Sequence, residues 1–213
     1  MGVVPNEHSS IVVLLYCVDQ FISVPNEWCV IQNSKVSVSD VGILGFELYF
    51  PKNYVCQKDL EQFDGVGAGK YTIGLGQSEM SFCYNNEDVC SLALSATSAL
   101  LHNYKIDADS IGFLEVGSET LIDKSKRADV KNACFGGTQA MLHAVDWVYS
   151  NYDTEERLAI VVCVDIAVYA AGPARCTGGA GAVALLIGPN ASLVLERGLR
   201  GAFSKNTYDF YKP

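Results

Sequence analysis

Apolar residues follow two different patterns along this chain, and the two patterns alternate. Segments typical of strands in a buried sheet, either apolar throughout or rich in β-forming residues, occupy 41–51, 111–118, 158–165 and 181–188. The segments 88–104 and 135–152 instead repeat apolar residues at helical spacing, with Asp88 as a candidate N-cap of the first helix. In that helix the apolar positions are 89, 92, 93, 96 and 100. Alternating strands and helices predict an α/β layered domain with functional residues at the strand ends.

The residues before position 41 lack this alternation. Their apolar run "IVVLLYCV" (11–18) is shorter than the roughly 20 residues that cross a membrane, so we expect no membrane span. The opening "MGVVPNEHSS" contains no Lys or Arg, so we expect neither a secretory signal nor a mitochondrial presequence. No linker rich in Pro, Ser or charge divides the remainder. We therefore expect an N-terminal segment of unassigned role over 1–40 and one domain over 41–213.

The composition narrows the possible partners. With 213 residues, of which 49% are hydrophobic and 18% charged, the chain can bury a sizeable core. Its net charge of -9 argues against nucleic-acid binding, which needs a basic surface for the phosphates. The 8 cysteines form no C-x-x-C pair and the 3 histidines show no zinc-ligand spacing, so we expect no metal site. Several cysteines lie in apolar strand segments, which favours a reduced cytosolic setting over disulfides.

One cysteine stands in a position that suits a nucleophile. In "DVKNACFGGTQAML" (129–142), Cys134 lies at the start of a predicted helix, where free N–H groups and the helix dipole favour a thiolate. Gly136 and Gly137 remove side-chain bulk, so that a thioester carbonyl could approach the sulfur. The alternative is that Cys134 is a small packed residue and that the glycines only permit close packing. The residues alone leave both interpretations open.

A nucleophilic cysteine needs a group that handles protons. His143 lies about 13 Å further along the same helix and on its opposite face, so we do not expect it to be the base. Glu119 follows the apolar strand at 111–118, where partial burial would raise its pKa towards that of a useful base. Asp165 occupies a similar place at the end of 158–165. A carboxylate at a strand end can equally be a solvated group or one that hydrogen-bonds a loop.

Five longer segments carry a resemblance to a known family. They are "DGVGAGKYTIGLGQ" (64–77), "LEVGSETLIDKSK" (114–126), "NACFGGT" (132–138), "DIAVYAAGPARCTGGAGAVALLIGPNA" (165–191) and "ERGLRG...YDFYKP" (196–213). In this order they closely resemble the hydroxymethylglutaryl-CoA synthases. The resemblance implies the first half of a thiolase-like layered fold. It also implies a homodimeric acyltransferase that condenses acetyl-CoA with acetoacetyl-CoA and needs no cofactor besides these substrates. Similarity to the animal enzymes implies the cytoplasmic form, which serves the mevalonate, isoprenoid and sterol pathway.

The resemblance also implies roles for individual residues. The cysteine of the family motif N-A-C-[YF]-G-G-T forms the acyl-enzyme, which makes Cys134 the nucleophile. The second glutamate of E-V-G-[TS]-E-T is the general acid and base, which corresponds to Glu119 and not to Glu115. Supporting residues around the site correspond to Asp123, Asp165, Tyr169 and Asp209. Substrate-binding residues correspond to Ala68, Gly69, Lys70 and Thr177. Lys70 would contact a coenzyme A phosphate, whereas without the family it reads as a solvent-facing lysine.

The chain differs from the family at several places. Family members carry a helix and a strand between the segments that correspond to "DKSK" and "NAC", whereas only "RADVK" stands here. We therefore expect an internal deletion and no strand directly before Cys134. No histidine matches the family's catalytic histidine, so we expect no complete turnover by this chain alone. Two alternatives stay open: a non-catalytic truncated product or incomplete gene model, and another thiolase-superfamily condensing enzyme that depends on an acyl carrier protein.

Overall fold

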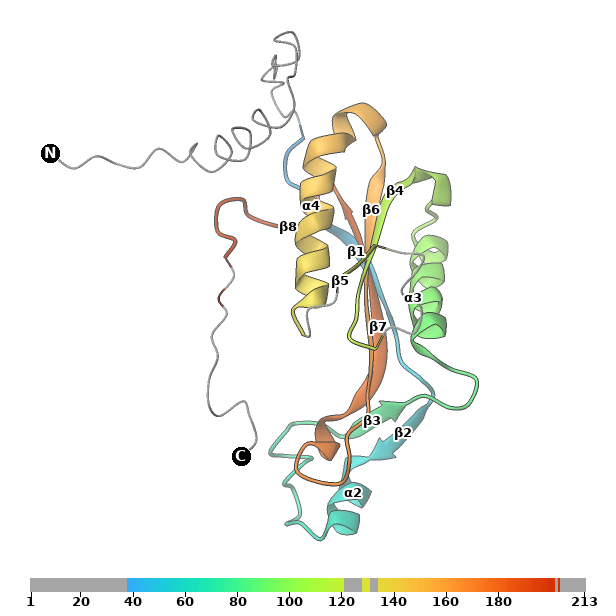
Figure 1. The fold of residues 1–213 in the computed structure, drawn as a ribbon, viewed down its shortest axis with the longest axis vertical. Helices are drawn as coiled ribbons and strands as arrows, with labels where there is room; N and C mark the ends of the chain where they lie inside the picture. Colours follow the sequence, from blue (N-terminus) through green and yellow to red (C-terminus); the bar gives the residue numbers. More distant parts are fainter. Residues whose placement is uncertain (1–37, 121–127, 131–133, 202, 204–213) are drawn as a thin grey trace, which may run out of the picture. The chain divides into compact units, whose positions relative to one another are not determined.

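The computed structural model describes residues 38–120, 128–130, 134–201 and 203, all within one compact unit of the chain. The centre of this unit is a mixed six-stranded sheet with one long helix on each face (Figure 1). Across the sheet the strands follow the order β5 (Ala128–Val130), β4 (Ile111–Gly117), β6 (Leu158–Ala167), β7 (Gly179–Gly188), β1 (Gly42–Tyr49) and β8 (Leu193–Val194). The α/β layered architecture expected from the sequence is confirmed.

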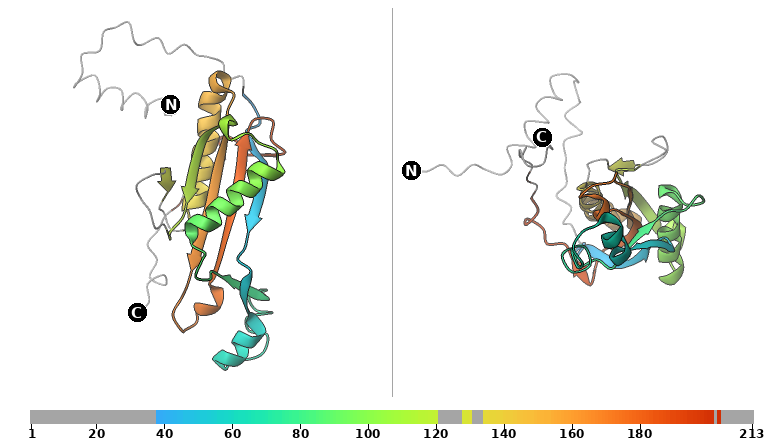
Figure 2. Two further views of the ribbon diagram at one scale, coloured as in Figure 1. Left: turned by 90° about the vertical axis from the view of Figure 1, so that its right-hand side faces the viewer. Right: turned by 90° about the horizontal axis from the view of Figure 1, so that it is seen from below.

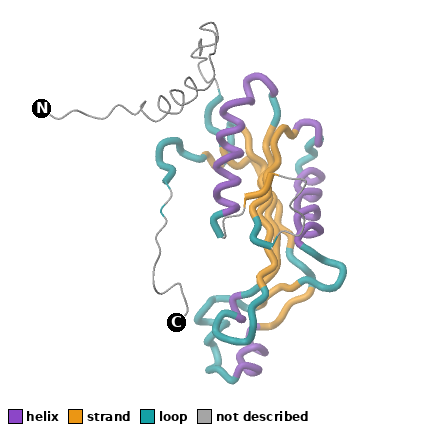
Figure 3. Tube along the Cα trace, in the orientation of Figure 1, coloured by secondary structure: helices purple, strands orange, loops and turns teal. Residues whose placement is uncertain are grey.

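Because β4 and β6 are parallel neighbours, they finish at the same end of the sheet. β4 runs parallel to β5 and β6, whereas β7 is antiparallel to both β6 and β1, and β8 is antiparallel to β1. The carboxyl ends of β4 and β6 therefore lie side by side. Figure 3 shows the strands as one band between the helices. The four strands predicted from the sequence correspond to β1, β4, β6 and β7, and all four are confirmed.

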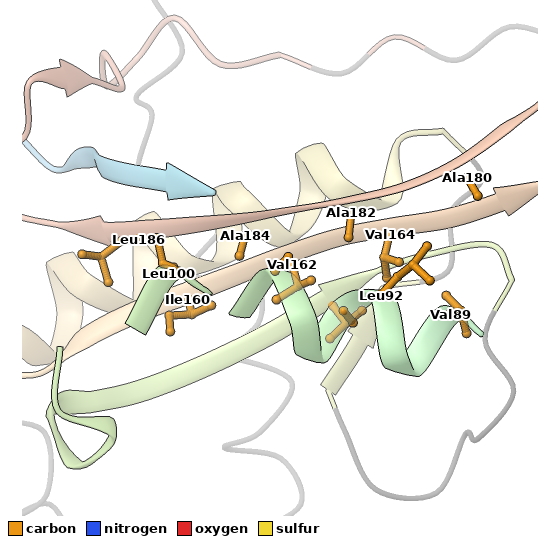
Figure 4. Packing of buried hydrophobic residues seen from close by; sticks show 13 residues of the cluster. Val89, Leu92, Leu100, Ile160, Val162, Val164, Ala180, Ala182, Ala184 and Leu186 are labelled. Atoms are coloured by element: carbon orange, nitrogen blue, oxygen red, sulfur yellow. The ribbon is translucent and has the colours of Figure 1, made fainter. Parts of the chain in front are cut away.

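Helix α3 (Val89–Asn103) covers one face of the sheet. Its buried residues are the five apolar positions predicted from the sequence: Val89, Leu92, Ala93, Ala96 and Leu100. They pack against Val162 and Val164 of β6 and against the small residues of β7, among them Ala182 (Figure 4). Asp88 caps the helix as predicted, because its carboxylate accepts the Ser91 N–H at 2.7 Å and the Ser91 hydroxyl accepts the Asp88 N–H at 2.8 Å.

Helix α4 (Gly136–Glu155) covers the opposite face (Figure 2). Val145 and Val148 are fully buried and pack with Val161 of β6 in a second apolar cluster. The helix begins without a side-chain cap, since its N-cap residue is Phe135. Neither this helix nor any other in the described part of the chain is long and apolar enough to cross a membrane.

A smaller sheet, which the sequence did not predict, lies beyond the end of the large one (Figure 1). It pairs β2 (Asn53–Cys56) with β3 (Glu79–Phe82), and helix α2 (Gln57–Asp64) follows β2 directly. Leu60, Tyr71 and Cys176 form a third buried cluster beside it. Two short 3-10 turns, Ala108–Ser110 and Arg175–Thr177, precede β4 and β7.

The structure corrects one expectation about the segment before Cys134. We expected no strand there, yet Ala128–Val130 forms β5, in parallel register with Glu115–Gly117 of β4. The physical reason is the open edge of β4, whose unpaired N–H and C=O groups form a template for any short extended segment. The residues "ADV" therefore lie in the sheet, paired with the edge of β4.

Candidate active site

Cys134 lies where the sequence placed it, directly before the first turn of α4. Its side chain is exposed, and its thiol donates a hydrogen bond from Sγ to Oε1 of Glu119 at 3.6 Å. The two residues come from different elements, since Glu119 follows β4. The structure thus brings the predicted nucleophile and the predicted base into direct contact.

Glu119 is more open to solvent than expected. The sequence led us to expect partial burial, but the residue is exposed, because β4 ends at Gly117 and Glu119 stands in the turn beyond the sheet. The expectation that Glu119 is partly buried is therefore wrong. What fixes Glu119 is its backbone, whose N–H donates to Oδ1 of Asp165 at 2.8 Å.

One carboxylate oxygen of Asp165 accepts hydrogen bonds from several residues of the turn after β4. Besides the Glu119 N–H, its Oδ1 accepts the Ser118 hydroxyl at 3.1 Å, the Thr120 N–H at 3.2 Å and the Thr120 hydroxyl at 3.1 Å. The Ile166 N–H in turn donates to the Thr120 hydroxyl at 3.2 Å. Asp165 lies near the end of β6, the parallel neighbour of β4, and this explains why it reaches the turn. Its place near a strand end is confirmed, and its contacts tie the backbone of Glu119 to β6.

The glycines at the start of α4 allow the helix to approach the sheet. A Cβ on Gly117 would lie 2.5 Å from the Gly137 nitrogen, and one on Gly137 would lie 2.6 Å from Sγ of Cys163. A Cβ on Gly136 would lie 2.8 Å from the carbonyl oxygen of Val130. The packing interpretation of Gly136 and Gly137 is therefore correct for these two residues. The same close packing of α4 on the sheet also brings Cys134 near the end of β4.

A cavity of about 320 Å³ opens beside this contact. Its lining includes Cys134, Asp165 and a second thiol, that of Cys163 on β6. Burial raises the pKa of the Cys163 thiol, and the negative charge of Asp165 adds to that effect. Cys163 is therefore held in its neutral form beside the exposed Cys134.

His143 is engaged elsewhere on α4. Its Nδ1 lies 3.1 Å and 3.0 Å from the two carboxylate oxygens of Glu115, and its Nε2 contacts the side-chain amide of Gln139 at 2.7 Å. Glu115 is buried within β4, whereas Glu119 is beyond its end, as the sequence indicated. The sequence did not predict the Glu115–His143 pair, which joins α4 to β4.

Two of the predicted substrate-binding residues line another cavity. Lys70 and Thr177 line a cavity of about 570 Å³, whereas Tyr169, which was predicted as a supporting residue, lines a smaller one of about 180 Å³. Ala68 and Gly69 precede Lys70 in the loop after α2 and are not part of either lining. Lys70, Thr177 and Tyr169 therefore line cavities other than the one that Cys134 lines. Asp123 and Asp209 lie outside the described residues.

The wall of the large cavity contains a charged cluster that the sequence did not indicate. Arg175 forms an ion pair with Asp64 and lines both the large and the small cavity. The Tyr71 hydroxyl donates to the other oxygen of Asp64 at 3.0 Å, and the Arg175 guanidinium lies 5.3 Å from the centre of the Phe63 ring. Arg175 lies 111 residues after Asp64 in the sequence, so no local pattern could have predicted their ion pair. Among the described residues no three His, Cys, Asp or Glu side chains gather as a metal site.

A family model described as hydroxymethylglutaryl-coenzyme A synthase N terminal matches residues 37–130 and 126–192. The chain belongs to the hydroxymethylglutaryl-CoA synthase family. The two matched segments meet at 126–130, where the sequence predicts the internal deletion. The hydroxymethylglutaryl-CoA synthase of Caenorhabditis elegans is 53% identical over 199 residues, which cover 85% of this chain and 43% of that enzyme.

Further relatives agree on the family and on the fold. The mitochondrial and the cytoplasmic hydroxymethylglutaryl-CoA synthases of Mus musculus are each 52% identical over 82% of this chain, which covers 38% and 37% of their lengths. The solved structure described as MvaS in complex with 3-hydroxy-3-methylglutaryl coenzyme A aligns with a TM-score of 0.75 and 37% identity, covering 82% of this chain and 46% of that one. The thiolase-like fold is thereby confirmed, and the chain spans less than half the length of these relatives.

Proposed function

We propose that this chain carries the acetyl-transfer site of hydroxymethylglutaryl-CoA synthesis, with Cys134 as nucleophile and Glu119 as general acid and base. The observation that carries the proposal is the contact of 3.6 Å between the Cys134 thiol and the Glu119 carboxylate, in a chain of this family. A thiol beside a carboxylate can lose its proton to that group as it attacks.

In the proposed first step, the Cys134 sulfur attacks the carbonyl carbon of acetyl-CoA. Glu119 accepts the thiol proton and returns it to the departing coenzyme A thiolate, so that it is ionised again. In the second step Glu119 removes a proton from the acetyl methyl group, and the resulting carbanion attacks the ketone carbon of acetoacetyl-CoA. The proton passes from Glu119 to the new alkoxide, and water then hydrolyses the Cys134 thioester to release hydroxymethylglutaryl-CoA.

The large cavity supports the proposal that the substrates are acyl-CoA thioesters. Its volume of about 570 Å³ suits part of a cofactor-sized ligand, and Lys70 supplies a positive charge at its wall. That charge matters because the protein as a whole carries -9. A homodimer and a cytoplasmic location belong to the same proposal. The six described cysteines are free thiols, which supports a reducing compartment. Light scattering of the purified chain and fractionation of its native cells test these two points.

Incubation with radiolabelled acetyl-CoA tests the chemistry directly. We expect label on Cys134, located by peptide mass spectrometry, and none in Cys134→Ala. Cys90→Ala is the matched control, because it removes a half-buried thiol on α3, away from the site, and should label like the wild type. Folded wild-type protein that takes up no label would overturn the proposal and favour the non-catalytic alternative.

Two further arms separate the remaining possibilities. With acetoacetyl-CoA present, we expect no hydroxymethylglutaryl-CoA from this chain alone, so product formation would contradict that expectation. Labelling by acetyl-loaded acyl carrier protein but not by acetyl-CoA would favour another condensing enzyme of the superfamily.

A further inference from the structure

Glu61 is a buried carboxylate that no step of the proposed reaction uses. It lies on α2, its exposed fraction is 4%, and the segment 69–72 folds around it. Its Oε2 accepts the Gly69 N–H at 2.9 Å. Its Oε1 accepts the N–H groups of Tyr71 and Thr72 at 2.7 Å and 2.8 Å, and the Thr72 hydroxyl at 3.1 Å. One side chain thus holds the backbone on both sides of Lys70.

The charge of Glu61 is secured by the same contacts. The N–H groups of Thr72 and Gly69, with smaller contributions from Tyr71 and the Thr72 hydroxyl, hold the pKa of Glu61 at about 2, against the opposing effect of burial. Glu61 is therefore a carboxylate throughout the neutral range. Burial of such a charge is stable only while these donors surround it.

The segment uses all its backbone donors internally. The Lys70 N–H donates to the Gly67 carbonyl at 3.1 Å, so every N–H from Gly69 to Thr72 has a protein acceptor. Gly69 adopts a φ of +86°, in the left-handed region that favours glycine, and this sharp turn sets the direction of Lys70. An anion at this segment can therefore be bound by the Lys70 side chain but not by the backbone.

Lys70 is placed for that task. It is exposed, it lines the cavity of about 570 Å³, and within the described part of the chain its ammonium forms no ion pair. Arg175, the other cation of this cavity wall, is already paired with Asp64. Lys70 is thus the cation of this wall that remains available to a ligand.

We propose that Glu61 is a positioning residue for coenzyme A binding, which holds the segment 69–72 so that Lys70 faces the cavity. This inference rests on the proposed function, because coenzyme A is the ligand assumed. Loss of the carboxylate leaves three backbone N–H groups without their acceptor. The segment 69–72 then rearranges, and Lys70 no longer faces the cavity.

Titration calorimetry with coenzyme A itself tests the inference on the 213-residue chain. Lys70→Met should raise Kd by about 10-fold or more, the size expected for one lost charge-assisted hydrogen bond. Glu61→Gln keeps one acceptor oxygen but not the second, and should raise Kd by about 3- to 10-fold. Because Glu61 acts through Lys70, the double variant should bind within about twofold of Lys70→Met alone. Asp59→Asn, an exposed change on the same helix, should bind like the wild type.

A second readout separates positioning from mere support of the fold. At saturating acetyl-CoA, Glu61→Gln should acetylate Cys134 at the wild-type rate, because only binding is impaired. If Glu61→Gln does not fold, Thr72→Val, which removes one hydroxyl donor, should still raise Kd by about twofold or more. A lowered unfolding midpoint with unchanged Kd would overturn the inference and leave the proposed function intact. Wild-type protein that binds no coenzyme A would overturn both.

Discussion

Replacing Asp165 by alanine tests whether this carboxylate positions Glu119. Its Oδ1 accepts hydrogen bonds from the Ser118 hydroxyl, the Glu119 N–H and both the N–H and the hydroxyl of Thr120. Alanine keeps the backbone of β6 but removes the common acceptor of all these donors. The turn that carries Glu119 must then bind water instead or adopt another conformation.

The magnitude follows from the number of contacts and from their exposure. A hydrogen bond to an ionised group contributes about 1.5–3 kcal/mol to stability. The contacts share one oxygen atom, so their contributions do not add. Asp165 is half-buried and Glu119 is exposed, so water replaces part of the loss. We expect the free energy of unfolding to fall by about 2–3 kcal/mol, and the rate of Cys134 acetylation to fall by about 100-fold, as for a reacting group misplaced by about 1 Å.

Urea unfolding followed by circular dichroism measures the first quantity, and single-turnover labelling with acetyl-CoA measures the second. Asp165→Asn is the matched variant: its amide oxygen can still accept hydrogen bonds, but neutral ones are roughly half as strong, so both losses should be smaller. Asp59→Asn, on an exposed face of α2, serves as the control. Folded Asp165→Ala that acetylates Cys134 at the wild-type rate would refute the positioning role, whatever the loss in stability.

Three further predictions follow from other parts of the structure. Iodoacetamide near neutral pH should alkylate the exposed Cys134 well before Cys163, whose pKa is raised by burial, and peptide mass spectrometry reports the order. Glu61 has a folded-state pKa of about 2 against an ordinary 4.5, so its contribution to stability is complete above 4.5 and is lost as the pH falls towards 2. The stability gap between wild type and Glu61→Gln should therefore shrink over that window in urea titrations, and a constant gap would contradict the assignment. Leu92→Ala removes a fully buried side chain and should lower the free energy of unfolding by about 2–5 kcal/mol.

The long elements could be predicted from the sequence because their apolar patterns match the faces that they bury. In α3, the predicted apolar positions are the buried ones, from Val89 to Leu100. Strand β7 is covered on both faces: Ala184 packs on the α3 side and Ile187 on the α4 side. A strand of this kind reads as a continuous apolar run, which is the signal that "GAVALLIG" carries.

The smaller sheet and α2 could not be predicted, because much of what α2 buries is polar. Its buried residues are Gln57, Leu60 and Glu61. The Gln57 side-chain amide donates to the Cys176 carbonyl at 2.7 Å, and Glu61 accepts from the segment 69–72. Such hydrogen bonds depend on partners elsewhere in the chain and leave no periodic trace in the sequence. From its apolar pattern alone, this segment is therefore predicted to lie on the surface.

The candidate site could be predicted as a set of residues but not as an arrangement. The family motifs indicated Cys134 and Glu119, yet both side chains are exposed, so no burial pattern could show that they meet. Their contact depends on Gly117, where a Cβ would lie 2.5 Å from the Gly137 nitrogen, and on Asp165, which ties the turn after β4 to β6. Both constraints are exerted by residues that take no part in the proposed proton transfers. The reactive pair is therefore set by packing and backbone hydrogen bonds at the ends of β4 and β6, and substitutions there should change the chemistry while both reactive side chains remain in place.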